Sequence, residues 1–327
     1  MTATPTTTSG GTGAGSSAAG DGPVVPPSSL QVYRELGDLK RLRDARGEGS
    51  LADRAFVRSW RTLLADPSPA AVQRLALRET AHALAAARLA GVDAGVLALA
   101  GLSRQERLEV LRRAFDAVTS TAEGGLGDLV DLRAALDPDP LDEALLPAEP
   151  GFVRALVRQP RAGATHPVRP RIVVEPPESH GDHCFATAVY SALVAPRHGV
   201  PRGEAFLVAL AHHLPNGDLP DAGFGGEVLL GEHYLPVLAA LEERSLAQLP
   251  AAVAQRLREL LPQRELADNP VGRVFNTADV LDRVLQVHHH ARAAGFTADQ
   301  ALDDLDIVHP GAVQQFQLRV LAEAGIP

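Results

Sequence analysis

The chain has 327 residues, of which 45% are hydrophobic, so it is long enough for one large domain or two ordinary domains with real cores. Its 31 basic and 40 acidic residues give a net charge of −9, which argues against a nucleic-acid polymer as a partner. The single cysteine, Cys184, excludes an intramolecular disulfide, and no window holds the roughly eighteen uninterrupted apolar residues of a membrane span. We therefore expect a soluble, cytoplasmic protein that does not contact a membrane.

The first 29 residues are rich in Thr, Ser, Gly and Pro, and they lack the basic start and apolar core of a signal peptide. A segment of this composition buries too little apolar surface to order itself. We expect a disordered tail over residues 1–29.

Residues 30–160 carry apolar residues at three- and four-residue steps, which predicts packed amphipathic helices over 51–65, 70–90 and 103–120. Ser103 and Glu106 have the spacing of a capping box, and Ser68-Pro69 opens the helix before it. His82 is isolated among alanines and leucines, so we expect it to serve packing. These features predict a helical N-terminal domain that contributes no chemistry.

Prolines, arginines and a short β-like segment at 171–175 mark a boundary near residue 161. Beyond it, the pattern predicts helices over 184–196, 201–214, 225–245, 251–261, 269–295 and 311–325. Asn269 is a favourable N-cap residue, and Pro270 suits the first turn that follows. The expected fold is all-α, with an N-terminal helical bundle region followed by a second helical domain over 161–327.

Metal-ligand residue types occur at three places in this second domain. His183 lies at the start of one expected helix, His212 and His213 end the next, and Asp279 lies inside a third. Asp279 has apolar neighbours, and a buried carboxylate needs a cation to offset its loss of hydration. Asp282 is followed by Arg283, so we expect it to be solvated.

The stretches "ESHGDHCFATAVYSAL", "AHH", "GDLP" and "NPVGRVFNTADVLDRVLQ" follow one another in an order that resembles the HD-domain superfamily of metal-dependent phosphohydrolases. The 5'-deoxynucleotidase-like branch is the most similar. The resemblance extends from about residue 161 to the C-terminus. It implies that His183, His212 and Asp279 bind a metal ion, and that Asp218 lies near an acidic position of the catalytic site.

Two residues depart from the family pattern. His213 stands where the family has aspartate, so the fourth expected ligand is an imidazole. Asn216 stands where the nucleotidase branch carries a glutamate that handles the attacking water, and an amide is no general base at neutral pH. Glu227 and His233 are candidate substitutes, with a solvated helix face as the alternative for each.

Three imidazoles and one carboxylate form a ligand set that favours Fe, Mn, Co, Ni or Zn over Mg. Arg169, Arg171 and His180 are candidates for binding a phosphate group, although the arginines equally suit an exposed linker. His288, His289 and His290 point about 100° apart on a helix and cannot face one ion, so we interpret them as a cationic cluster near the helix end.

The function that the sequence favours is a metal-dependent phosphohydrolase acting on a nucleotide or another small phosphate ester. The alternative is a non-catalytic ligand-sensing or interaction protein that keeps a metal site. An HD-type iron oxygenase is less favoured, because it needs additional histidines and only His233 lies nearby. Oligomeric state is left open, with a homo-oligomer as one outcome.

Overall fold

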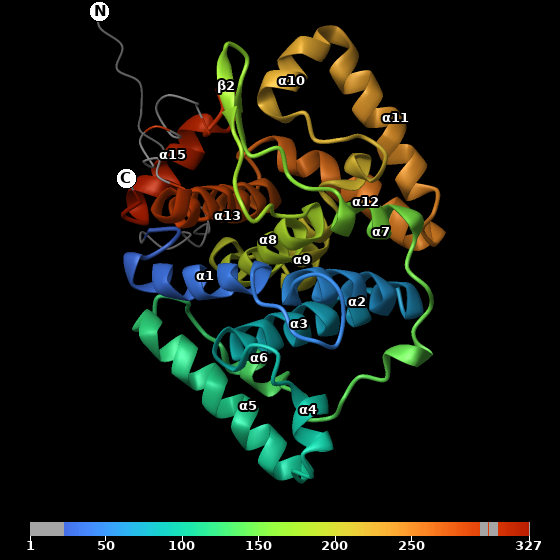
Figure 1. Cartoon of the computed structure of the whole chain (residues 1–327), viewed down its shortest axis with the longest axis vertical. Coiled ribbons are helices and arrows are strands. Elements are labelled where there is room, and N and C mark those ends of the chain that lie inside the picture. The colour runs from blue at the N-terminus through green and yellow to red at the C-terminus, as the bar shows by residue number, and fades with distance from the viewer. Residues whose placement is uncertain (1–22, 295–299, 301–306, 327) are drawn as a thin grey trace, which may run out of the picture.

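The computed structural model describes residues 23–294, 300 and 307–326, with the side chains of 292–294 left aside. This part of the chain is built almost entirely from helices, which confirms the all-α prediction (Figure 1). Residues 1–22 of the expected tail lie outside the described residues. The expected tail extends too far, because Val25 is buried and Pro27–Ser29 form a turn of 3-10 helix.

The helices in chain order are α1 (Leu30–Gly37), α2 (Leu51–Ala65), α3 (Pro69–Leu89), α4 (Ala94–Leu99), α5 (Arg104–Thr119), α6 (Val130–Ala134), α7 (Gly151–Arg158), α8 (His180–Val194), α9 (Arg202–Ala211), α10 (Gly223–Leu230), α11 (Tyr234–Leu246), α12 (Ala251–Leu260), α13 (Pro270–Ala294) and α15 (Gln314–Glu323). Two short strands, β1 (Ala164–His166) and β2 (Arg169–Ile172), form an antiparallel hairpin. The strand expected at 171–175 is real but begins earlier and ends at Ile172.

Several helix ends follow from local sequence. The capping box of α5 forms as predicted, with Ser103 and Glu106 satisfying each other's backbone N–H groups. Asn269 accepts a hydrogen bond from the backbone N–H of Gly272 at 2.8 Å and starts α13. The single helix expected over 225–245 is instead divided at Gly231, whose φ of 55° lies in the left-handed region.

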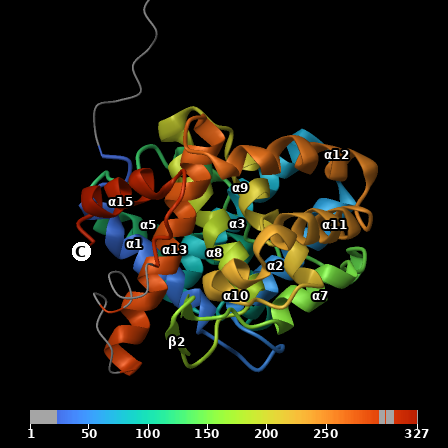
Figure 2. The same ribbon diagram turned by 90° about the horizontal axis from the view of Figure 1, so that it is seen from above.

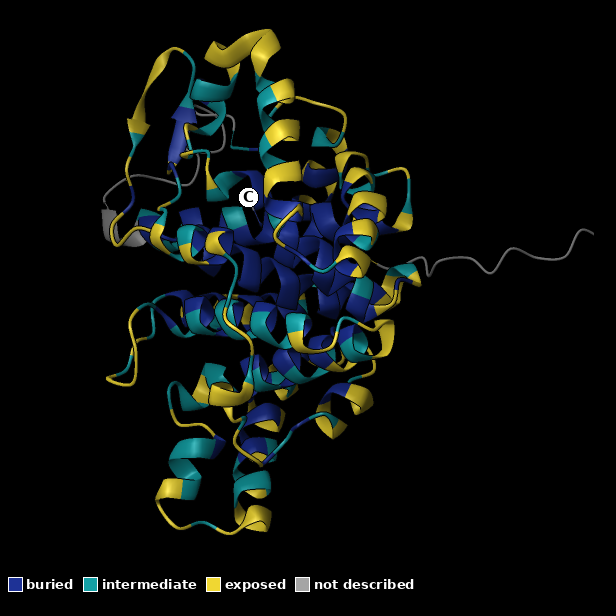
Figure 3. Ribbon diagram, turned by 90° about the vertical axis from the view of Figure 1, so that its right-hand side faces the viewer, coloured by how far each residue is buried: buried dark blue, intermediate teal, exposed yellow. Residues whose placement is uncertain are grey.

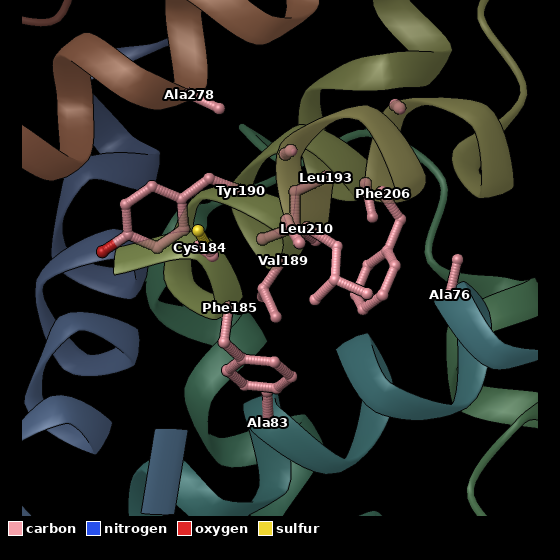
Figure 4. Packing of buried hydrophobic residues seen from close by; sticks show 14 of the residues in the cluster. Ala76, Ala83, Cys184, Phe185, Val189, Tyr190, Leu193, Phe206, Leu210 and Ala278 are labelled. Carbon is pink, nitrogen blue, oxygen red and sulfur yellow. The ribbon is translucent and has the colours of Figure 1, made fainter. Parts of the chain in front are cut away.

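Helix α8 lies at the centre of the molecule (Figures 1 and 2), and all of its residues are buried. It contacts α9, α13, α2, α7 and α3. Figure 4 shows its side chains directed at neighbouring helices: Cys184, Phe185, Val189, Tyr190 and Leu193. A helix that is covered on every side has no solvent face for polar groups, so the histidine in its first turn must find partners inside the protein.

One hydrophobic cluster joins the two expected domains. It includes Phe56 and Trp60 from α2, Phe185 from α8 and Val280 from α13, and it forms the dark centre of Figure 3. Because this cluster contains residues from both sides of residue 161, the hydrophobic core does not divide there, and separate folding of the two regions stays a prediction.

The hairpin and the α10–α11 arm lie at one end of the molecule, at the top of Figure 1. Helix α10 contacts β1. In the described part of the chain, no helix combines the length and apolar character needed to cross a bilayer.

Candidate metal centre

Three helices bring three of the expected ligands together. His183 comes from the first turn of α8, His212 caps the end of α9, and Asp279 comes from the middle of α13. The Nε2 atoms of His183 and His212 are 3.0 Å apart, and Asp279 Oδ1 is 3.3 Å from His183 Nε2. These residues lie 96 positions apart along the chain at most (279 − 183), yet the donor atoms of His212 and Asp279 both lie next to His183 Nε2.

Hydrogen bonds at the far side of each ring fix which nitrogen carries a proton. His212 Nδ1 lies 2.6 Å from the carbonyl oxygen of Ala209, which can only accept, so Nδ1 is the donor. His183 Nδ1 donates to Asp282 Oδ2 at 2.7 Å. In the neutral rings both Nε2 atoms are therefore lone-pair acceptors that face each other, an arrangement that a cation between them would stabilise.

The spacing suits such a cation. Two ligand atoms about 2.1 Å from one ion lie about 3.0–3.4 Å apart when they subtend angles between octahedral and tetrahedral values. The 3.0 Å and 3.3 Å separations at His183 fall in this range. An imidazole that donates its other N–H to a carboxylate, as His183 does to Asp282, is the usual support of a metal-bound histidine.

His213 is differently engaged. Its ring belongs with those of His183 and His212 to a group whose ligating nitrogens all lie within 4.8 Å of one another. However, its Nδ1 donates to Asn216 Oδ1 at 2.8 Å, and its Nε2 accepts from Arg161 Nη1 at 2.5 Å. Arg161 would have to release this ring before His213 could bind an ion.

Electrostatics favour ionised carboxylates beside these histidines. Burial opposes ionisation of Asp279, but the guanidinium of Arg283, at 3.1 Å, is the largest of the contributions that hold the pKa of Asp279 well below its usual range. Burial also depresses the pKa of His212 well below its usual value. The centre therefore offers a neutral imidazole at His212 and an ionised carboxylate at Asp279, the protonation states that metal binding requires.

The expectation that Asp282 is solvated is wrong. Asp282 is completely buried, and its second oxygen accepts from Lys40 Nζ at 2.8 Å rather than from its neighbour Arg283. Lys40 also donates to Glu178 Oε1 at 2.7 Å. Lys40 follows α1, so the N-terminal region contacts Asp282, and the expectation that this region contributes no chemistry stays a prediction.

A cavity of about 670 Å³ opens beside the centre. His212, His213 and Asp279 line it, together with three arginines: Arg161, Arg264 and Arg283. Its remaining wall combines apolar and aromatic residues (Phe224, Leu230, Tyr234, Leu235, Leu238 and Phe275) with five further acidic residues: Glu178, Asp221, Glu227, Glu242 and Glu265. This volume and mixture are typical of a small-molecule site.

The two expected catalytic carboxylates have different positions. Glu227 lines the cavity, and burial raises the pKa of its carboxyl, opposed by a hydrogen bond from Tyr234. Asp218 does not line it and instead pairs with Arg244 at 2.9 Å. Asp221, rather than Asp218, lines the cavity. Its oxygens accept hydrogen bonds from the backbone N–H groups of Ala162 at 2.9 Å and Gly223 at 2.8 Å.

The expected phosphate-binding residues do not reach the cavity wall. Arg169 and Arg171 are exposed on β2, and Arg171 donates to the carbonyl of Ala222 at 3.3 Å. His180 is fully buried, with Nδ1 bonded to the carbonyl of Gln159 and its ring edge against His213. No pattern in the sequence singled out Arg161, which is the arginine beside the histidines.

Other histidines lie apart from the centre. His233 is exposed, with 79% of its side chain accessible, next to Glu232. His290 is buried, and burial lowers its pKa to about 4, so it does not form the cationic helix end that we expected. Its Nε2 is bonded to Gln286 at 2.9 Å.

Comparison with protein-family models, with curated proteins and with solved structures finds no match to this chain.

Proposed function

We propose that the protein is a mononuclear metal-dependent phosphohydrolase that acts on a nucleotide or another small phosphate ester. The observation that carries the proposal is the pair of facing Nε2 acceptors of His183 and His212, with Asp279 beside them, at the wall of an arginine-lined cavity. The resemblance of the sequence to HD-domain phosphohydrolases supports the same function.

His183, His212 and Asp279 would hold the ion, and Fe, Mn, Co, Ni or Zn suit this ligand set better than Mg. A bound divalent ion supplies an acidified water molecule and neutralises charge on a phosphoryl group. The protein's own contribution is to fix the donor atoms: Asp282 orients His183, and the carbonyl of Ala209 orients His212.

Arg161 and Arg283 lie on the cavity wall close to these ligands, where their guanidinium groups can bind the phosphate oxygens. The apolar and aromatic part of the wall would accommodate the organic part of the ester. Because burial raises the pKa of Glu227, this side chain is suited to keep a proton and donate it to the leaving oxygen.

One observation favours the non-catalytic alternative. The residue after His212 is His213, and the residue three positions later is Asn216, so neither position carries a carboxylate. His213 is instead hydrogen-bonded to both Arg161 and Asn216. A protein with this arrangement could bind a metal and a phosphorylated ligand without hydrolysing it.

A combined metal and turnover experiment separates these functions. The purified protein, stripped and reloaded with Mn, Fe, Co, Ni or Zn, is expected to bind about one ion per chain and to release phosphate from a panel of 5'-mononucleotides and p-nitrophenyl phosphate. His212→Ala should abolish both properties, whereas His289→Ala should leave them intact. Absence of metal would defeat the proposal, and one ion without phosphate release would establish the non-catalytic alternative.

A further inference from the structure

Lys40 is the only lysine in a chain whose other thirty basic residues, of the 31 in total, are arginines. It ends the 3-10 turn Asp38–Lys40 that follows α1, and only 2% of its side chain is accessible. Its ammonium donates to Glu178 Oε1 at 2.7 Å and to Asp282 Oδ1 at 2.8 Å. The one lysine ammonium of the chain is thus buried directly behind the candidate metal centre.

The position of this ammonium is one that a metal ion could take. Glu178, His183 and Asp282 place one ligating atom each within 4.8 Å of one another, and Lys40 contacts two of the three. Two carboxylates buried this closely need a cation, because their mutual repulsion and loss of hydration would otherwise destabilise the fold.

The chemistry of lysine fits this position better than that of arginine. An ammonium is a compact charge with three donors, whereas a guanidinium is a wide planar fork that binds carboxylates side by side. Lys40 reaches two separate carboxylates from one nitrogen. Burial alone would lower the pKa of Lys40, but Asp282 and Glu178 outweigh it and raise the pKa, so the group stays charged.

Asp282 connects Lys40 to the candidate metal centre through hydrogen bonds. One oxygen accepts from Lys40, and the other accepts from His183 Nδ1 at 2.7 Å. With Asp282 held in this orientation, His183 presents Nε2 toward His212 and Asp279. Lys40 does not line the cavity and so does not face a ligand there.

We infer that Lys40 is a positioning residue of the metal centre: its ammonium serves as a built-in cation that fixes Asp282 against His183 and occupies the place of a second ion. This inference rests on the proposed metal site and extends it to a residue of the N-terminal region. It also implies that the centre holds one ion per chain.

The test compares Lys40→Met with Arg58→Met. Both variants remove a cation from a buried carboxylate, since Arg58 Nη2 pairs with the buried Glu79 at 2.6 Å in the N-terminal region. Glu79 also keeps Arg78 at 3.3 Å. We expect both to be less stable, but only Lys40→Met to change Co²⁺ binding, measured by visible absorption and by metal analysis. The affinity should fall by about ten- to a hundredfold, as for loss of other groups that orient a ligating histidine.

Each outcome is decisive. Weaker Co²⁺ binding by Lys40→Met alone supports the inference, and so does uptake of a second ion by that variant, because a metal then replaces the ammonium. Unchanged affinity and stoichiometry in Lys40→Met would overturn it, as would an equal loss in Arg58→Met.

The wild-type protein provides a second measurement if Lys40→Met does not fold. Labelling with ¹⁵N-lysine gives a single side-chain signal, since the chain has one lysine. We expect a slowly exchanging ammonium whose signal shifts when Co²⁺ or Zn²⁺ is added, and a rapidly exchanging or unresponsive signal would contradict the inference. Wild-type protein that takes up no ion would defeat both this inference and the proposed function, whereas metal uptake without hydrolysis would defeat only the enzyme.

Discussion

Two regions of the molecule bury the same three kinds of group. In the N-terminal region, Arg58 neutralises Glu79, which is 1% exposed, and His82 lies one turn later on α3. At the metal centre, Lys40 neutralises Asp282, which is bonded to His183. Each cluster combines a cation, a buried carboxylate and a histidine.

The clusters differ in how the histidine uses its Nε2 atom. His82 Nε2 accepts the backbone N–H of Asp137 at 3.2 Å, so its lone pair is already satisfied within the fold. His183 Nε2 instead faces another acceptor, His212 Nε2, at 3.0 Å. Both regions bury charge, so buried charge does not by itself distinguish a candidate functional site from a structural cluster. The facing Nε2 atoms of His183 and His212 are what distinguish the candidate metal centre.

Paired substitutions at the two carboxylates should have the largest effects. Asp282→Asn removes the charge that supports His183, so we expect metal affinity to fall by about ten- to a hundredfold. Glu79→Gln removes the nearer of the two carboxylates that pair with Arg58, whose side chain is 24% exposed, and should cost about 1.5–3 kcal/mol of stability without changing metal affinity. Calorimetric metal titration and urea unfolding would measure the two properties.

The proposed difference between the two clusters would be contradicted if Glu79→Gln weakened metal binding as much as Asp282→Asn does, under conditions in which the Glu79→Gln variant is folded. It would also be contradicted if Asp282→Asn left the affinity unchanged.

Much of the fold could be predicted because local sequence determines it. The apolar periodicity and the flanking serine caps locate α2 and α5 to within a residue. The sequence could single out His183, His212 and Asp279 as candidate ligands because each lies at the end of an apolar run or within one.

The remainder of the centre could not be predicted because its partners are distant in sequence. Asp282 was assigned to solvent on account of the adjacent Arg283, yet its partner is Lys40, 242 residues away. Arg161 was not among the predicted site residues, and only the folded chain brings it to His213. The one available signal was composition, since a single lysine among so many arginines is unusual enough to mark a special position.

A smaller effect is expected at His213, where an aspartate would restore the family pattern. His213→Asp adds a hard, anionic ligand next to His212 and gives Arg161 a carboxylate to pair with. We expect the preference for Mn or Mg relative to Co or Zn to rise on the order of tenfold. Competition between these ions, followed by metal analysis, would measure this. An unchanged preference would show that residue 213 does not contact the ion.

The smallest expected effect is the contribution of His82 to the pH dependence of stability. Burial lowers the pKa of His82 to about 4, whereas an unfolded histidine titrates near its ordinary value of 6.5. Between these values the unfolded chain binds a proton that the folded protein does not, so stability is lost as pH falls from 6.5 towards 4. We expect His82 to account for about 1 kcal/mol of the loss between pH 7 and pH 5, allowing for its partial exposure. His82→Gln keeps an acceptor for the Asp137 N–H but does not titrate, so its unfolding free energy should fall less over this interval than that of the wild type. Equal falls in the two proteins would contradict a neutral, structural His82. Metal affinity at neutral pH should be the same in both, because His82 Nε2 is bonded within the N-terminal region.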